Sequence, residues 1–395
     1  MLPVRQKTTF STMPAFKSRI ESALAERKTQ GLNRSMNVVF AGNQSVLEHE
    51  GRRYINFSSN DYLGLANDQA LVRAWQQGLS VYGSGSGASP MVTGFSAAHS
   101  NLEAALTEWL GYDRAILFGS GFSANQALLF TLLEKSDVLI QDRLNHASLM
   151  EAGALSPAKM KRFKHNDIEH LKSLINSEDN HLVVTEGVFS MDGDCAPLSD
   201  IAEVTRSHDA WFAVDDAHGI GVLGQSGGGS CELATVKPEI LIVTFGKAFG
   251  MSGAAILCDH ATGDFLTQFA RHHVYSTAMP PAQAYALTHA VSIVQEQSWR
   301  REKLSELSEV YRDCLSDLEG FVETQTSIKP FVIGESELAL QVASACRQNG
   351  IWVTAIRPPT VPKGTSRLRI TLTANHTNEQ VKTLSMALKQ ALGAL

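Results

Sequence analysis

The chain has 395 residues, of which 44% are hydrophobic and 19% charged, and 34 Lys and Arg against 40 Asp and Glu leave a net charge of −6. This composition excludes disordered, collagen-like and coiled-coil proteins, and a mildly acidic chain lacks the basic surface of most nucleic-acid-binding proteins. The length accommodates two domains, or one large α/β domain with appended segments. The five scattered cysteines form no CxxC pair, which argues against a disulfide framework and a zinc site and favours the cytoplasm.

The sequence predicts no membrane-spanning segment anywhere in the chain. The uncharged stretch 115–133 has a polar, glycine-rich centre, GSGFSANQ, which is unsuited to a bilayer. Residues 1–12 lack the apolar core of a signal peptide, so we interpret them as a frayed tail, with Met13 as an alternative start. Apolar residues at helical spacing predict a helix over 15–34, and alternation around Glu50-Gly51 predicts a β-hairpin over 45–57.

From residue 60 to about 280, short apolar runs alternate with helical stretches of ten to fifteen residues. The runs are nearly continuous, as is typical of strands that are buried on both faces, so the pattern predicts a mostly parallel α/β sheet. The predicted strands are 115–118, 138–141, 181–185, 211–214, 241–245 and 254–258. A long helical pattern covers 283–318, and a smaller α+β region follows over 321–395.

Polar residues follow almost every predicted strand, at the carboxyl ends where open α/β sheets bind ligands. They are the small run Gly119–Gln126; Asp142, Asn145 and His146; Glu186, Ser190 and Asp192; Asp215, Asp216 and His218; and Lys247 between Gly246 and Gly250. Each has an ordinary structural explanation, such as a helix cap for Asp215 or a structural role for His146. Their joint placement at successive strand ends favours an active site.

Two hypotheses compete at the glycine-rich turn after the first strand. The sequence Gly119-x-Gly121-x-x-Ala124, with Asp142 about 20 residues later, matches a dinucleotide-binding motif. The same turn also suits the phosphate of pyridoxal phosphate, which further requires a lysine and a carboxylate for its pyridine nitrogen. Lys247 and Asp215 meet these requirements, whereas the dinucleotide hypothesis leaves both without a role.

The pyridoxal phosphate hypothesis assigns chemistry to several side chains. Burial beside a cationic group lowers a lysine pKa, which would keep the amine of Lys247 reactive, and ionised Asp215 would keep the pyridine nitrogen protonated. His146 would stack on the ring and His218 would hydrogen-bond its phenolic oxygen. Arg357, held between Ile356 and two prolines, is the candidate for a substrate carboxylate.

These motifs resemble those of the α-oxoamine synthases, which are fold-type I pyridoxal-phosphate enzymes. The resemblance implies a large, mostly parallel seven-stranded sheet domain and a small C-terminal α+β domain. It lies in FSSNDYLGL (57–65), GSGSGASPMVTG (83–94), GSGFSANQ (119–126), NHASL (145–149), VTEGVFSMDGD (184–194), VDDAHGIGVLG (214–224) and VTFGKAFG (243–250). We expect an N-terminal helix-and-hairpin segment (1–58), a large cofactor domain (59–285) and a small domain (286–395).

A narrower set of motifs is similar to the family members that condense L-alanine with a pimeloyl thioester and release CO₂. These motifs are SMDGD (190–194), YSTAMPPAQA (275–284) and TAIRPPTVPKGTSRLRI (354–370). Other members of the family, which join glycine to acetyl-CoA or succinyl-CoA or serine to a long acyl chain, remain alternatives. The acyl carrier, either acyl-carrier protein or CoA, is also open.

The resemblance implies a role for each site residue. Lys247 would bind the cofactor covalently and then act as the base on the alanine Cα proton. The other cofactor contacts implied are Gly121, Phe122, His146, Ser190, Asp215, His218 and Thr244. Thr277 would reach the phosphate in a neighbouring subunit, which implies a homodimer with the active site at the subunit interface. Substrate contacts would come from Arg34, Asn60, His146, Arg357 and Thr360. An NAD-dependent oxidoreductase is the alternative from another class, and a cofactor-free interaction protein is the least supported hypothesis.

Overall fold

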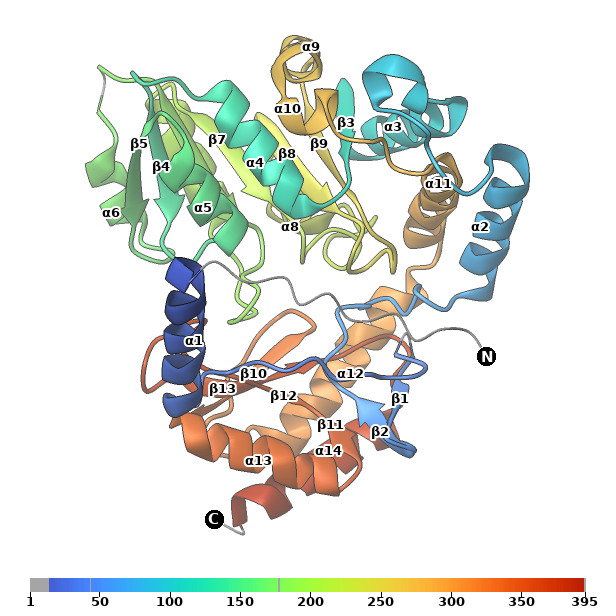
Figure 1. Cartoon of the computed structure of the whole chain (residues 1–395), viewed down its shortest axis with the longest axis vertical. Coiled ribbons are helices and arrows are strands. Elements are labelled where there is room, and N and C mark those ends of the chain that lie inside the picture. The colour runs from blue at the N-terminus through green and yellow to red at the C-terminus, as the bar shows by residue number, and fades with distance from the viewer. Residues whose placement is uncertain (1–13, 43, 177, 394–395) are drawn as a thin grey trace.

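The computed structural model describes residues 14–42, 44–176 and 178–393, so the predicted tail and the question of Met13 lie outside the described residues. A large sheet domain and a smaller domain lie one above the other, connected by several chain segments (Figure 1). The large domain contains a seven-stranded sheet in the order β3-β9-β8-β7-β6-β4-β5, in which β9 alone runs antiparallel to its neighbours. The predicted α/β class and mostly parallel sheet are therefore confirmed.

The predicted apolar runs form the strands of this sheet. Alternate residues of one strand enter different cores: Leu241 and Val243 of β8 contribute to one hydrophobic cluster, and Ile240 and Ile242 to the other. Burial on both faces explains why these strands read as continuous apolar runs. The strands are β3 (Arg114–Phe118), β4 (Val138–Asp142), β5 (Lys159–Phe163), β6 (His181–Glu186), β7 (Trp211–Asp215), β8 (Ile240–Thr244) and β9 (Ala254–Cys258).

Helices cover both faces of the large sheet (Figure 1). Among the described residues, no helix is both long enough and apolar enough to cross a membrane. The helices of this part are α2 (Gln69–Tyr82), α3 (Ala97–Leu110), α4 (Gly121–Leu132), α5 (Ala147–Leu155), α6 (Ile168–Leu174), α7 (Leu198–Ser207), α8 (Gly229–Ala234), α9 (His260–Phe269), α10 (Arg271–Val274) and α11 (Pro281–Glu296), with a π-helical turn at Pro90–Gly94.

The structure differs from the sequence-based elements at three places. Strand β5 was not predicted, because its sequence KMKRF lies at the sheet edge and buries only Phe163. Helix α1 (Pro14–Thr29) ends before the predicted residue 34, and Gly31 has a left-handed backbone with φ 65°. The helical pattern over 283–318 is two helices, α11 and α12 (Trp299–Leu315), because Gln297 leaves the helical conformation.

The smaller domain combines both ends of the chain. Strands β10 (Ile328–Gly334), β13 (Ser366–Thr371) and β12 (Thr354–Ile356) form one antiparallel sheet. The predicted hairpin is present as β1 (Val46–His49) and β2 (Arg52–Asn56), and β2 pairs with β11 (Ile351–Trp352). Helices α12, α13 (Ser336–Gln348) and α14 (Asn378–Gly393) complete it. The expected boundary at 285/286 falls within α11, which packs on α2 and α3, and the three-part division stays a prediction.

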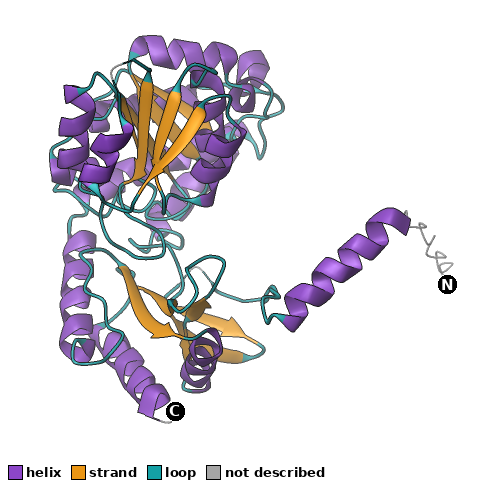
Figure 2. Cartoon of the chain, turned by 90° about the vertical axis from the view of Figure 1, so that its left-hand side faces the viewer, coloured by secondary structure: helices purple, strands orange, loops and turns teal. Residues whose placement is uncertain are grey.

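Helix α1 stands clear of both domains (Figure 2). Its apolar side chains Phe16, Ile20 and Leu24 are 53%, 54% and 63% exposed. The helical spacing of these residues is therefore correct, but among residues 14–42, 44–176 and 178–393 of one chain the apolar stripe covers no core.

His376 links the N-terminal hairpin to the C-terminal domain and should make stability pH-dependent. Its Nδ1 accepts from the Thr373 amide at 3.1 Å, and its Nε2 lies 3.0 Å from the carbonyl of Asn56, so the neutral ring satisfies both groups. Burial lowers the pKa of His376 to about 4. Since the folded-state pKa is lowered, its contribution to stability is present above the unfolded-state pKa near 6.5 and is lost as the pH falls towards 4.

We expect that this single group reduces the free energy of unfolding by about 3 kcal/mol between pH 7 and pH 4. Urea unfolding of the chain and of His376→Gln across this range measures the effect. Because the other buried histidines are common to both proteins, the variant should lose less stability on acidification. Equal losses in the two proteins would contradict the assignment.

Candidate active site

Seven of the predicted site residues line one cavity at the carboxyl ends of the parallel strands. The cavity lies where the β3–α4 turn meets the loops that follow β4, β7 and β8. The seven are Gly121, Phe122, His146, Asp215, His218, Thr244 and Lys247. The structure thus brings together the turn, the lysine, the carboxylate and both histidines, although they span more than 120 residues of sequence.

Lys247 enters the cavity directly after β8. Its side chain is partly buried, and its Nζ donates to Thr244 Oγ1 at 3.3 Å. Desolvation by burial lowers the pKa of Lys247, although Asp215 and Glu186 oppose this effect. The lysine therefore has more neutral, nucleophilic amine at neutral pH than an exposed lysine would have.

Asp215 is the last residue of β7, and its carboxylate is held by two donors. Asn125 Nδ2 donates to Oδ2 at 2.7 Å, and the Ala217 amide donates to Oδ1 at 3.0 Å. These two donors fix the orientation of the carboxylate in the cavity. Asn125 is a site residue that sequence reasoning missed, although it lies within the quoted motif GSGFSANQ.

His146 has a defined tautomer. The Ser148 amide donates to its Nδ1 at 3.2 Å, and Ser148 Oγ lies 2.7 Å from the same atom. A neutral ring then carries its proton on Nε2. Burial, with a further contribution from the charge of Lys247, lowers the pKa of His146, so the ring is neutral at physiological pH.

His218 is paired with a buried tyrosine. Tyr62 Oη lies 2.5 Å from His218 Nδ1, and both side chains are buried. Burial places the pKa of His218 well below its ordinary value and raises the pKa of Tyr62. The pair is therefore neutral at physiological pH. Tyr62 was also missed, although it lies in the motif FSSNDYLGL.

The N-terminus of α4 forms a cup suited to an anion. Ser120 caps the helix by accepting from the Ser123 amide at 3.1 Å, so of the first-turn amides those of Gly121 and Phe122 remain to bind an anion. A Cβ atom on Gly121 would lie 2.6 Å from Thr244 Cγ2, so only glycine fits beside β8 there. A Cβ on Gly119 would meet open space. The cup, the buried amine and the paired carboxylate together fit pyridoxal phosphate.

Ser190 and Asn60 do not line this cavity but are joined to each other by a buried arginine. Arg369 Nε donates to the carbonyl of Ser190 at 2.6 Å, and its Nη1 donates to Asn60 Oδ1 at 3.0 Å. Arg369 therefore connects the small domain to the segment after β6. Sequence reasoning assigned it no role, because it stands within strand β13 and not after one.

The remaining predicted residues lie in other cavities. Arg34, Arg357 and Thr360 line a cavity between the segment after α1 and the loop after β12. There Arg357 Nη1 donates to the carbonyl of Gly31 at 2.5 Å. Thr277 lines a small cavity that shares Gly119 with the main one. Within a single chain, neither Arg357 nor Thr277 enters the cavity of Lys247.

Glu186, the last residue of β6, also lines the main cavity. It is 3% exposed, and its Oε1 has no hydrogen-bond partner within residues 14–42, 44–176 and 178–393. Burial, with a smaller contribution from Asp215, raises the pKa of Glu186 well above the ordinary value. The sequence placed Glu186 at this rim but gave it no role.

The dinucleotide hypothesis is wrong on geometric grounds. In a dinucleotide site the acidic residue ends a strand beside the glycine-rich turn. Here β3 pairs with β9, whereas β4, which ends in Asp142, lies between β6 and β5. The Asp142 carboxylate is fully buried and bonded to His165 and to the Leu144 and Asn166 amides.

Comparisons with known proteins agree with this geometry. The sequence pattern of the family "Aminotransferase class I and II" matches residues 52–388. A protein of Vibrio campbellii named 8-amino-7-oxononanoate synthase is 92% identical over 97% of this chain and all of its own length. A serine palmitoyltransferase structure from S. paucimobilis with a bound PLP–myriocin aldimine has a TM-score of 0.90 and 28% identity, covering 95% of this chain and 98% of its own.

A structure named 8-amino-7-oxononanoate synthase from Francisella tularensis has a TM-score of 0.76 and 29% identity, covering 86% of this chain and 98% of its own. The resemblance drawn from the sequence motifs is therefore confirmed. This chain belongs to the class I and II aminotransferase family and, within it, to the 8-amino-7-oxononanoate synthases.

Proposed function

We propose that this chain is a pyridoxal-phosphate-dependent acyltransferase of biotin biosynthesis. It condenses L-alanine with a pimeloyl thioester to give 8-amino-7-oxononanoate, CO₂ and the free thiol of the carrier. The observation that carries this proposal is the buried Lys247 amine, which shares one cavity with the paired carboxylate of Asp215. The Vibrio campbellii relative, which is 92% identical over its full length and is named 8-amino-7-oxononanoate synthase, supplies the substrate class.

Pyridoxal phosphate, when bound, accepts the electron pair left at the alanine Cα when its proton or its carboxylate departs. Residues at several strand ends and at the start of α4 would hold it. The amides of Gly121 and Phe122, with Thr244, would bind the phosphate at the start of α4. Asp215 would bind the pyridine nitrogen, neutral His146 would pack on the ring, and His218 in the segment after β7 would hydrogen-bond the phenolic oxygen.

Lys247 has two successive roles. Its neutral amine would hold the cofactor covalently, and the same amine, once free, would act as the base on the Cα proton of alanine. The lowered pKa of Lys247 suits both roles, because a general base is most effective when its pKa is near the working pH. Asn125 and the Ala217 amide hold the Asp215 carboxylate in place by donating to its two oxygens.

The substrate is held from the other side of the site. Arg357 and Asn60 bind the alanine carboxylate, and Ser190 assists at the phenolic oxygen. Arg34 and Thr360 contact the substrate near Arg357, with which they share a cavity. Arg369 fixes both Asn60 and the backbone of Ser190, so it positions the two substrate-side groups together.

The active chain is a cytoplasmic homodimer with its sites at the subunit interface. Two features support this proposal: the exposed apolar stripe of α1, and the position of Thr277 outside the Lys247 cavity of its own chain. In the dimer, Thr277 would reach the phosphate bound by the partner. Sedimentation velocity should show a dimer, and a fully active monomer would contradict this part of the proposal.

The substrate assignment is tested by pairing each amino acid with each thioester. L-alanine, glycine and L-serine are incubated separately with pimeloyl, acetyl, succinyl and long-chain thioesters of CoA, and with pimeloyl acyl-carrier protein. Mass spectrometry of the amino ketone identifies the product. We expect 8-amino-7-oxononanoate from L-alanine and a pimeloyl thioester as the most rapidly formed product. A ketone formed only from glycine or serine would contradict the assignment and leave the mechanism intact.

A further inference from the structure

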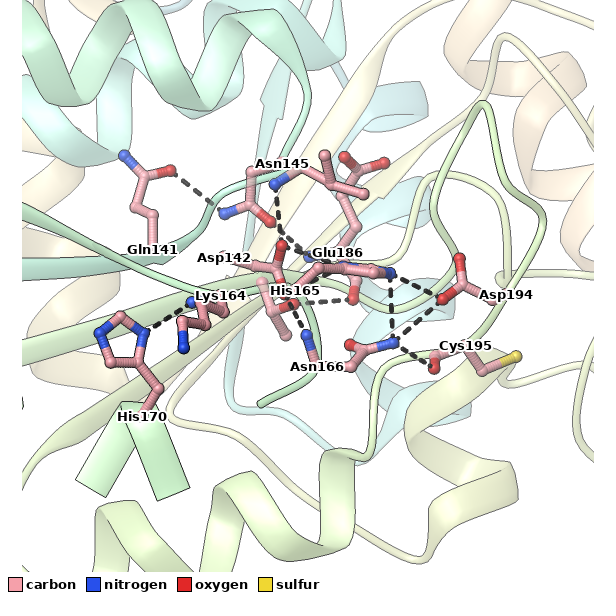
Figure 3. A network of polar contacts seen from close by, with 12 residues as sticks. Gln141, Asp142, Asn145, Lys164, His165, Asn166, His170, Glu186, Asp194 and Cys195 are labelled. Atoms are coloured by element: carbon pink, nitrogen blue, oxygen red, sulfur yellow. Dashed lines mark hydrogen bonds and ion pairs between the residues drawn. The ribbon is translucent and has the colours of Figure 1, made fainter. Parts of the chain in front are cut away.

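A partly buried polar network lies beside the active site and includes Asp142, Asn145, Glu186, His165 and Asp194 (Figure 3). At its centre, the ring of His165 lies between two carboxylates. His165 Nδ1 is 3.1 Å from Asp142 Oδ1, and Nε2 is 2.8 Å from Asp194 Oδ2. No role in the proposed chemistry has been given to any of these three residues.

The Asp142 carboxylate organises the loop after β4. It accepts from the Leu144 amide at 2.8 Å. In the same loop, Asn145 Nδ2 donates to the carbonyl of Val184, and Asn145 Oδ1 accepts from the amide of Glu186. The next residue is His146, so the position of the stacking ring depends on how this loop is anchored.

Asp194 organises a different loop, the one after β6. The Phe189 amide donates to its carbonyl at 3.0 Å, and the Gly193 amide donates to the carbonyl of Phe189 at 2.8 Å. These bonds close a tight turn that contains Ser190. The edge of the His165 ring also packs on Phe189, with 4.4 Å between the ring centroids and an interplanar angle of 88°.

The ring of His165 joins these two loops as a cation. Each ring nitrogen faces a carboxylate oxygen, and an imidazole donates from both nitrogens only when it is protonated. Although burial opposes it, the two aspartates raise the pKa of His165 to about 9, so the charge is present at neutral pH. The neighbouring Asn166, at φ 54°, adds a second link, because its amide N–H reaches Asp142 Oδ2 and its side chain reaches Asp194 Oδ2.

We propose that His165 is a positioning residue that ties the loop carrying His146 to the loop carrying Ser190, and so fixes two sides of the cofactor site relative to each other. This inference rests on the function proposed above. His165 itself lines neither the Lys247 cavity nor the Arg357 cavity, so it acts only through the two loops. A misplacement of about 1 Å at reacting groups costs up to about 10²-fold in rate, so the tie has a measurable effect.

The test compares His165→Ala and His165→Gln with the matched control His170→Gln in the holoenzyme. His170 accepts from the Lys164 amide at the start of α6 and touches neither Asp142 nor Asp194. We expect kcat to fall about 10- to 100-fold in the His165 variants with little change in KM. We also expect the visible circular dichroism of the bound cofactor to change in amplitude. His170→Gln should match the unchanged chain in all three measurements.

Hydrogen–deuterium exchange gives a readout that does not depend on turnover. Loss of the tie should increase exchange in both segments 143–149 and 187–195, and His165→Gln serves if His165→Ala does not fold. A lower melting temperature with unchanged exchange in 187–195, kcat and cofactor dichroism would overturn the proposal. Failure of the proposed function can be distinguished from failure of this inference. In that case the unchanged chain would show no cofactor band and form no ketone, and hydrogen–deuterium exchange would still show whether His165 ties the two loops together.

Discussion

Replacing Lys247 by alanine should reduce turnover by about 10²- to 10⁴-fold or more, since the loss of a catalytic base alone has this size. The variant loses both the covalent attachment of the cofactor and the base for the Cα proton. Because the side chain is only partly buried and donates one bond, to Thr244 Oγ1, the fold should persist. Single-turnover assays of 8-amino-7-oxononanoate, with far-ultraviolet circular dichroism to verify folding, measure the effect.

The control for this variant is Lys135→Ala. Lys135 is exposed in the connection between α4 and β4, away from the cavity, so its loss should leave turnover unchanged. Borohydride reduction followed by mass spectrometry should attach the cofactor to the unchanged chain and to Lys135→Ala only. Turnover by Lys247→Ala at the normal rate would refute the proposed mechanism as a whole.

Replacing Asp215 by asparagine should reduce kcat by about 10²- to 10³-fold, a loss typical of removing one preorganised electrostatic contact. The neutral amide cannot hold a proton on the pyridine nitrogen. Asn125 Nδ2 now donates to Asp215 Oδ2 at 2.7 Å. The new amide would face this donor either with its own NH₂ group, which cannot accept, or with its oxygen, which is a weaker acceptor than a carboxylate. Steady-state kinetics and the absorption maximum of the bound cofactor measure the two consequences.

Asp264→Asn provides the comparison for Asp215→Asn. Asp264 lies on α9, pairs with Arg114 and is distant from the cavity lining. Its replacement should leave kcat and the absorption maximum unchanged. If Asp215→Asn retained normal kcat, the pyridine nitrogen would need another partner, and the orientation proposed for the cofactor would be wrong.

The sequence predicted the large sheet because its strands are buried on both faces. Strands such as Ile240–Thr244 are almost entirely apolar and fully buried. A helix that covers a sheet buries only one face, so its sequence would alternate apolar and polar residues. Strand β5 was not predicted because it lies at the edge of the sheet, where fewer side chains are buried. In its sequence KMKRF only Phe163 is fully buried, so it shows no apolar run. Local sequence also could not indicate that the N-terminal hairpin pairs with Ile351–Trp352, since that contact joins segments nearly 300 residues apart.

The site residues also divide into those that local sequence could indicate and those that only the folded chain shows. Lys247, Asp215 and His218 follow strands, so their meeting could be inferred from the rule that parallel strands end at one edge. Asn125, Tyr62 and Arg369 lie within helices, turns or strands, and only the folded chain shows that they bond to Asp215, His218 and Asn60. The role of Thr277 at the phosphate of a neighbouring subunit stays a prediction, because the structure of a single chain does not include that contact.

His165 illustrates a further limit of sequence reasoning. It follows β5, the strand that the pattern did not predict, so it had no assigned position at the sheet edge. Once β5 is placed beside β4, His165 comes next to Asp142, and the turn after β6 supplies Asp194. Asp142, which matched a dinucleotide-binding motif in the sequence, is therefore an ion-pair partner of His165 in the fold.

The most direct test of the central claim is the visible absorption spectrum of the purified chain, recorded while L-alanine, glycine and L-serine are added separately. Our account predicts a yellow band that borohydride bleaches and that shifts at a lower concentration of L-alanine than of glycine or L-serine. Borohydride should attach the cofactor covalently to the unchanged chain and not to Lys247→Ala. A chain that shows no such band even after pyridoxal phosphate is added would contradict the account.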